Sequence, residues 1–144
     1  MQKLKIFCDG GARGNPGPAA TGFVVKTASE KVLVEKGEAI GRATNNIAEY
    51  QAVIHALTWL IENPASRDNF SFNFYLDSLL VVQQLKGIYK VKNEKLRLLL
   101  TQAKMLENKL AKPVFYSHIP RNKNEEADRL VNTALDNLPQ SLLK

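Results

Sequence analysis

Residues 3–18 of the chain read KLKIFCDGGARGNPGP, an apolar run followed by an aspartate and a segment rich in glycine and proline. The run Lys3 to Cys8 predicts a strand, and Gly10 to Pro18 predicts a turn. Asp9 stands between the two, where the strand is expected to end. Ligands bind beyond the carboxyl ends of strands in open α/β sheets, so Asp9 is a candidate ligand-binding residue. The structural alternative is that this aspartate simply belongs to the turn.

Outside this segment, the apolar pattern alternates between the period of strands and that of helices. Strands are expected at 22–25 and 32–34, and a helix is expected from the spacing that starts at Ile47 and ends at Pro64. The later expected elements are, in order, a strand at 71–76, helices at 78–86 and 94–110, a strand at 113–119 and a helix at 124–138. This order predicts an α/β fold with a five-stranded mixed sheet and helices on both faces.

The bulk composition describes one basic domain. The chain has 144 residues, 44% of them hydrophobic, which is enough apolar material for one core. We expect the domain to cover residues 1–138, with a flexible tail at 139–144. The net charge of +6 favours a polyanionic partner such as nucleic acid. The sequence has no apolar run of membrane-spanning length, no recognisable signal peptide and a single cysteine, so we expect a cytoplasmic protein with no membrane contact, and a monomer.

Two further carboxylates stand at expected element boundaries. Asp77 ends a strand, and it would lie beside Asp9 if the two strands are parallel neighbours. Glu49 closes the segment TNNIAE at residues 44–49, at the start of a helix. Its spacing from Asn46 fits a capping box, so a ligand role and a capping role are both open for Glu49. Donor side chains cluster at the same helix start, a natural site for phosphate, and these are Arg42, Thr44, Asn45 and Asn46.

The fourth carboxylate, Asp128, falls in the first turn of the last expected helix, where the helix dipole favours negative charge. Glu125 and Glu126 could serve the dipole equally well, and we expect both to be solvated. Asp128 lies beside the core position Ala127, so we expect it to be partly shielded. Two carboxylates about 5 Å apart repel by roughly 3 kcal/mol at an effective dielectric of 20. A divalent cation relieves this repulsion, and a carboxylate-bound metal in a basic protein points to phosphodiester chemistry.

The remaining chemically active side chains carry weaker signals. We expect Cys8 to be a small core residue and His55 to lie at a helix surface or boundary. His118, near the end of the last strand, is expected to pack, although its position keeps it a candidate acid or base. A solvated face and a nucleic-acid contact surface are both open for the basic residues around Tyr89, which are Lys86, Lys90, Lys92, Lys95 and Arg97.

Together these motifs closely resemble type 1 ribonuclease H over residues 5–135. The matching motifs occur in the family's order, and they are DGGxxGNPG from Asp9, TNNxxE from Thr44, DS at Asp77 and NxxxD from Asn124. The resemblance implies a ribonuclease H-like fold and an endonuclease that hydrolyses the RNA strand of RNA–DNA hybrids by a two-metal mechanism. It implies that two Mg²⁺ ions, with Mn²⁺ as the alternative, are bound by Asp9, Glu49, Asp77 and Asp128.

The resemblance also implies how the hybrid is held. Contacts in the minor groove, where the 2′-hydroxyl distinguishes RNA from DNA, are expected from Asn15, Asn45 and Asn46. A close approach of the nucleic-acid backbone to the main chain is expected at the small residues Gly10, Gly11 and Ala12. A pocket for a phosphate of the DNA strand is expected from Arg42, Thr44 and Asn93.

Two departures from the family pattern concern substrate grip and product release. Many bacterial members carry an extra helix and basic loop where this chain has only Gly87 to Asn93, so Lys86, Lys90 and Lys92 would have to supply those contacts to the substrate. The loop before Asp128 lacks the histidine that assists product release in many members, and His118 or Arg121 is the candidate replacement. In both departures the chain resembles the archaeal and archaeal-like bacterial branch of the family. Some members of that branch also cut double-stranded RNA.

Two other functional classes are alternatives. A catalytically weak module that only binds hybrids would have no reason to keep four mutually repelling carboxylates. A DNA-strand transferase of the integrase type would share the fold, but the pair Asn45 and Asn46 counts against it.

Overall fold

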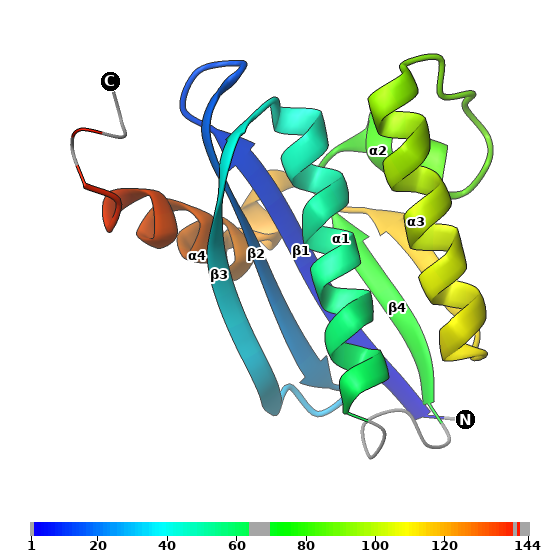
Figure 1. The fold of residues 1–144 in the computed structure, drawn as a ribbon. Coiled ribbons are helices and arrows are strands. Elements are labelled where there is room, and N and C mark those ends of the chain that lie inside the picture. The colour runs from blue at the N-terminus through cyan, green and yellow to red at the C-terminus, as the bar shows by residue number, and fades with distance from the viewer. Residues whose placement is uncertain (1, 64–69, 140, 142–144) are drawn as a thin grey trace.

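The structure is a computed structural model that describes residues 2–63, 70–139 and 141. The strands and helices follow the expected order (Figure 1). Their bounds are β1 Gln2–Ala12, β2 Gly17–Thr27, β3 Val32–Ala43, α1 Asn45–Glu62, β4 Phe70–Leu76, α2 Leu79–Leu85, α3 Glu94–Leu110, β5 Val114–His118, a 3-10 turn Arg121–Lys123 and α4 Glu125–Asp136. Pro64, the expected end of the first helix, lies outside the described residues, as do 140 and 142–144 of the expected tail.

The predicted five-stranded mixed sheet is confirmed, with the strand order β3-β2-β1-β4-β5. The pairs β1–β2 and β2–β3 are antiparallel, whereas β1–β4 and β4–β5 are parallel. The parallel pairs are connected through helices, because a tight turn cannot join two parallel strands. In this order β1 is the central strand, and β4 lies between β1 and β5.

Helices cover both faces of the sheet, as predicted. A Cβ atom on Gly10 of β1 would lie 2.1 Å from the backbone carbonyl carbon of Ala48, so α1 packs directly on this strand. A Cβ atom on Gly22 of β2 would lie 2.4 Å from the carbonyl oxygen of Ala127 in α4. Gly22 pairs with Asp9, the neighbour of Gly10, and successive strand residues point to opposite faces. The two helices therefore lie on opposite sides of the sheet, as Figure 1 shows.

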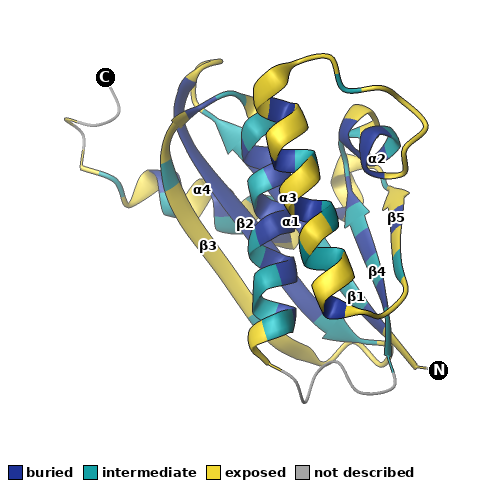
Figure 2. Cartoon of the chain, turned by 45° about the vertical axis from the view of Figure 1, so that its right-hand side comes forward, coloured by how far each residue is buried: buried dark blue, intermediate teal, exposed yellow. Residues whose placement is uncertain are grey.

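The main core lies between the sheet and the helices α1 and α3, and it includes the fully buried Ile6, Tyr50, Leu57 and Phe74. Each such side chain stabilises the fold by about 1.5–3 kcal/mol through its burial. A smaller cluster lies under α4. Figure 2 shows burial concentrated on β2 and the inner side of α1, while the edge strand β3 is mostly exposed. Among the described residues, no helix combines the length and the apolar character needed to span a membrane.

The glycine-rich segment after Asp9 is not the long turn that was expected at Gly10 to Pro18. β1 continues to Ala12, which pairs with Ala19 of β2, and only residues 13–16 form the turn. Small residues occupy this part of the strand because α1 packs against its backbone at Gly10. Glycine inside a strand often marks such a close approach of another segment. The prediction was wrong because a single sequence does not distinguish a glycine needed for packing from one needed for a turn.

Candidate metal centre and substrate groove

The fold brings all four predicted carboxylates to one cavity of about 470 Å³. Asp9 lies in β1, Glu49 in α1, Asp77 directly after β4 and Asp128 in the first turn of α4. β1 and β4 are parallel neighbours, so Asp9 and Asp77 reach the same edge of the sheet. The segments that carry the four side chains are therefore a strand end, a strand interior and two helix starts on opposite faces of the sheet.

Asp9 belongs to the interior of β1, not to its end as expected from the sequence. The parallel pairing with β4 stops where Phe7 pairs with Tyr75, but the antiparallel pairing with β2 continues. Beyond this point one side of β1 has no neighbouring strand, and Asp77 follows there. The site is open because β1 extends beyond its parallel partner β4. Asp9 is nevertheless only 7% exposed.

Glu49 does not cap the helix that carries it. The cap of α1 is Thr44, whose Oγ1 accepts a hydrogen bond from the Ile47 backbone N–H at 3.2 Å. Glu49 is 5% exposed, and its Oε1 accepts a hydrogen bond from the Gly10 N–H at 3.1 Å. Its second oxygen, Oε2, is buried without a hydrogen-bond partner among the described residues. Glu49 therefore lies in the cavity with one acceptor unused, and the capping interpretation is wrong.

The electrostatics of the cavity suit a bound cation. One carboxylate oxygen each from Asp9, Glu49 and Asp77 lies within 4.8 Å of the others, and Asp128 lines the same cavity. Burial, together with the charges of Asp77 and Asp128, raises the pKa of Asp9 to about 7. Burial and the charge of Asp9 raise the pKa of Glu49. Hard divalent cations prefer oxygen ligands of this kind, and the unused oxygen of Glu49 fits such an ion.

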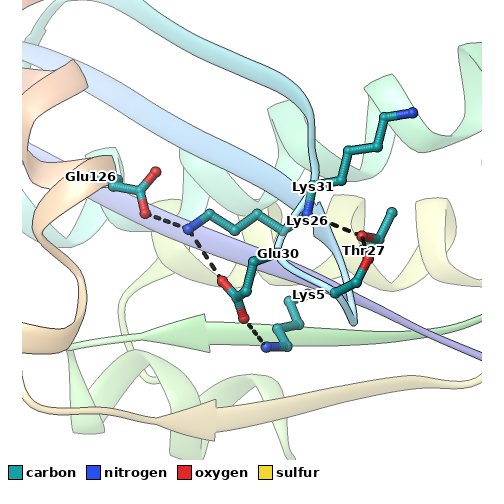
Figure 3. A network of polar contacts seen from close by, with 7 residues as sticks. Lys5, Lys26, Thr27, Glu30, Lys31 and Glu126 are labelled. Atoms are coloured by element: carbon teal, nitrogen blue, oxygen red, sulfur yellow. Dashed lines mark hydrogen bonds and ion pairs between the residues drawn. The ribbon is translucent and has the colours of Figure 1, made fainter.

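Asp128 is the partly shielded acid of its helix turn, as expected, while Glu125 and Glu126 are exposed. Glu126 pairs instead with Lys26 of β2. Figure 3 shows Lys26 between Glu126 and Glu30, with Glu30 also paired to Lys5. This ion-pair network joins the first turn of α4 to β1, to β2 and to the turn between β2 and β3.

The predicted minor-groove residues form a hydrogen-bonded connection between the β1–β2 turn and α1. Asn15 Oδ1 accepts a hydrogen bond from the Asn45 N–H at 3.0 Å, and Asn45 Oδ1 accepts one from the Ala12 N–H at 2.9 Å. The two bonds tie the turn to the start of the helix that carries Glu49. The cavity of the carboxylates is also lined by Gly10, Gly11, Ala12, Asn45 and Asn46.

A second hollow of about 620 Å³ adjoins the first and shares Asn45 and Asn46 with it. It holds the predicted phosphate-pocket residues Arg42, Thr44 and Asn93. Two helices start there, because Thr44 caps α1 and the Asn93 Oδ1 accepts a hydrogen bond from the Leu96 N–H at the start of α3. Helix N-termini attract anions through their free N–H groups and their dipoles.

The second hollow also contains a lysine that was not predicted as part of the phosphate pocket. Lys95 lines it, whereas Lys92 does not. Lys95 follows the cap residue Asn93 by two positions, within the first turn of α3, and Lys92 precedes the cap. The sequence contained this signal, because a lysine in the first turn lies near the helix start that binds anions.

The auxiliary residues separate in the structure. Arg121 lines the carboxylate cavity, but His118 is exposed and is not among its lining residues. The expected packing of His118 is therefore wrong. His55 lies at a boundary, as expected, where its Nδ1 and the Thr21 hydroxyl are 2.9 Å apart. Cys8 is fully buried, and burial raises the pKa of its thiol, which makes it an inert core residue.

Three polar lining residues of the carboxylate cavity were not predicted from the sequence as parts of the site. They are Arg13, Ser78 and Asn132. Asn132 lies four positions after Asp128 on α4, so helical spacing places both on one side of the helix. Arg13 lies beside Asp136, with Nη2 and Oδ1 2.7 Å apart, and this contact depends on the tertiary packing of α4.

Comparison with known proteins identifies the class of this fold and site. A family model described as reverse transcriptase-like matches residues 7–134. The fold and the carboxylate cluster define a ribonuclease H-like domain. The chain belongs to the type 1 ribonuclease H family, as its similarity over nearly its whole length to the RNase H1 of Halobacterium salinarum shows.

The similarity is close in sequence and in structure. The H. salinarum crystal structure is 38% identical, with a TM-score of 0.85, and the match covers 94% of this chain and 99% of that one. LC11-RNase H1, isolated from compost and solved in complex with an RNA/DNA hybrid, is 39% identical, with a TM-score of 0.88 and coverage of 92% and 96%. The bifunctional protein Rv2228c of Mycobacterium tuberculosis is 44% identical over 140 residues, 96% of this chain. The chain spans only 37% of the length of that relative.

Proposed function

We propose that the protein is a metal-dependent endoribonuclease that hydrolyses the RNA strand of RNA–DNA hybrids. The observation that carries this proposal is the cluster formed by Asp9, Glu49 and Asp77, with Asp128 in the same cavity and one buried oxygen of Glu49 unused. The adjoining hollow with two helix N-termini supports a nucleic-acid substrate. The complex of LC11-RNase H1 with an RNA/DNA hybrid supports the hybrid as that substrate.

The four carboxylates would hold two divalent cations in this proposal. When bound, Mg²⁺, or Mn²⁺ in its place, supplies Lewis-acid stabilisation of the charge that develops on the reacting phosphodiester. The protein contributes the orientation of its ligands, because the Gly10 N–H donates to Glu49 and orients this carboxylate. Asp9 and Glu49 are preorganised in a largely dry site, where their negative charge attracts cations more strongly than it would in water.

The two hollows would divide the hybrid between them. The RNA strand would lie at the carboxylates, and a phosphate of the DNA strand would lie at the second hollow with Arg42 and Lys95. Asn45 and Asn46 belong to both hollows, so they lie where a minor groove would cross between the strands. Their side-chain amides can hydrogen-bond a 2′-hydroxyl, which is present in RNA only. One copy of the chain carries all these parts, so we propose that it acts as a monomer.

The segment between α2 and α3 bears on specificity. Only residues 86–93 connect the two helices, so the described chain has no separate basic helix here to grip the duplex. Grip would then depend on the second hollow and on exposed lysines such as Lys86 and Lys90. We propose duplex RNA as a second, weaker substrate on this ground.

A cleavage assay with strand-specific labels tests the proposal. The full chain is incubated with a hybrid, duplex RNA and duplex DNA, each with Mg²⁺, with Mn²⁺ or with EDTA. We expect metal-dependent loss of the RNA strand of the hybrid, slower loss of duplex RNA and intact DNA. Asp9→Asn should abolish cleavage, while Glu125→Gln, an exposed acid in the first turn of α4, should cut normally. Intact hybrid that is nevertheless bound by the wild type would favour a binding module instead.

A further inference from the structure

Asn124 lies where the segments that carry three of the four carboxylates, Asp9, Asp77 and Asp128, meet. It is 1% exposed and directly precedes α4. Its Nδ2 donates a hydrogen bond to the backbone oxygen of Cys8 at 2.8 Å and to the Asp77 Oδ2 at 3.4 Å. Its own backbone oxygen accepts a hydrogen bond from the Asp128 N–H at 3.1 Å. One residue thus contacts the strand of Asp9, the carboxylate of Asp77 and the turn of Asp128.

The side chain of Asn124 does not do what asparagine usually does at this position. An asparagine at a helix cap normally accepts a hydrogen bond from an N–H of the first turn. Asn124 makes no such bond, because its amide turns away from α4 toward Cys8 and Asp77. Thr44, Ser78 and Asn93, at the starts of the other helices, all cap in the usual way. α4 therefore has no side-chain cap at its start, and the amide of Asn124 points toward Asp77 in the candidate metal centre.

The direction of the amide is determined by its neighbours. Both groups near Nδ2 are acceptors, a backbone carbonyl and a carboxylate, so only the NH₂ end of Asn124 can face them. The Oδ1 end is buried and has no partner among the described residues. A flip of the amide would place an oxygen against two oxygens. The Oδ1 atom of Asn124 is thus left without a hydrogen bond, while its NH₂ group donates to Cys8 and Asp77. Buried polar atoms without a hydrogen bond are rare in proteins.

We infer that Asn124 is a positioning residue for the metal centre. It holds the carboxylate of Asp77 in place relative to Asp9 and fixes the start of α4, and therefore Asp128, against β1. Hydrogen-bond partners that orient metal-ligating carboxylates typically contribute a factor of about 10–100 in metal affinity or activity. This inference rests on the proposed function, because it requires that Asp77 binds a cation.

The test compares Asn124→Ala and Asn124→Asp with Asn122→Ala, a change at an exposed asparagine of the same loop. Mg²⁺ binding to the full chain is measured by isothermal titration calorimetry at a temperature at which circular dichroism shows each variant folded. We expect Asn124→Ala to weaken Mg²⁺ binding by about 10-fold and to lower kcat, with the KM for the hybrid unchanged. Asn124→Asp keeps the shape but replaces the donor with an acceptor, so it should weaken binding at least as much. Asn122→Ala should match the wild type.

A purely structural role gives a different pattern. In that case Asn124→Ala would unfold at lower urea concentration but bind Mg²⁺ with wild-type affinity, and this outcome overturns the inference. If Asn124→Ala does not fold, Asn124→Asp decides, and unchanged or tighter Mg²⁺ binding in that variant also overturns the inference. The proposed function would be refuted by a different result. A wild type that binds Mg²⁺ but leaves hybrids intact refutes the cleavage proposal, whatever Asn124 does to Mg²⁺ affinity.

Discussion

The substitution Asp9→Asn should abolish cleavage and, at the same time, stabilise the metal-free protein. Asp9 is 7% exposed and lies in one cavity with three other carboxylates. Without a cation, its negative charge is desolvated and repelled, which is why its pKa rises from 3.8 to about 7. Asparagine has nearly the same shape and no charge, so it removes this cost without leaving a hole.

The size of the stabilisation follows from the pKa shift. A shift of about 3 units corresponds to roughly 4 kcal/mol at pH 8, at about 1.4 kcal/mol per unit. This is an upper limit, because Asp9 shares the effect with the neighbouring carboxylate Glu49. We therefore expect Asp9→Asn to raise the free energy of unfolding of the metal-free protein by about 1–3 kcal/mol at pH 8.

The pH dependence has a definite sign. The folded-state pKa of Asp9 lies above its unfolded value, so between about pH 4 and pH 7 the folded state binds more protons than the unfolded state. The stability of the metal-free wild type should therefore fall as the pH rises through this window. The advantage of Asp9→Asn should be near zero at pH 4, where the wild-type carboxyl is protonated, and complete at pH 8.

Urea unfolding with EDTA, followed by circular dichroism at several pH values, measures the effect. Glu125→Gln is the matched control, because it removes an exposed acid from the first turn of α4. Its stability should change by less than about 0.5 kcal/mol at all pH values. Excess Mg²⁺ should stabilise the wild type and leave Asp9→Asn nearly unchanged. Equal or lower stability of metal-free Asp9→Asn at pH 8 would refute the view that the cluster is strained without a cation.

Three further predictions concern packing, substrate grip and surface charge. Gly10→Ala should destabilise the fold by about 3 kcal/mol in urea unfolding, because its Cβ would meet the α1 backbone. Gly11→Ala should cost less than about 1 kcal/mol, because its Cβ would only contact the Val131 Cγ1 at 3.6 Å, an ordinary van der Waals distance. Lys95→Ala should raise the KM for a hybrid and lower the log–log salt slope of binding by about 1, with a smaller effect from Lys92→Ala. Glu126→Gln breaks an exposed ion pair and should shift stability by less than about 1 kcal/mol in thermal melts, so a larger loss would contradict its exposure.

Much of the fold could be predicted because the patterns behind it are local. The alternation of apolar residues in 70–76 and the helical spacing in 94–110 depend only on neighbouring positions, and both elements formed with nearly the expected bounds. The four carboxylates could be selected for the same reason, since each stands next to a recognisable boundary in the chain. A local pattern predicts which element forms and which side chains lie near its ends.

The errors all concern contacts between distant segments. Gly10 was expected in a turn, but it is a strand residue on which α1 packs. Glu49 had the spacing of a helix cap, but its partner is the Gly10 N–H, which lies 39 residues away in the chain. Nothing in the local spacing of these residues contains the distance to their partners.

The sequence alone was sufficient for the element order, the mixed sheet and the identity of the acidic residues, since these follow from the periodicity and chemistry of short segments. Tertiary structure was needed to show that β1 outruns β4, that Glu49 keeps one buried oxygen unused and that Asn124 faces Asp77 instead of capping its helix. These features exist only when segments far apart in the chain are packed together. Burial and proximity, which raise the pKa of Asp9 and make the cluster suitable for a cation, are properties of that packing.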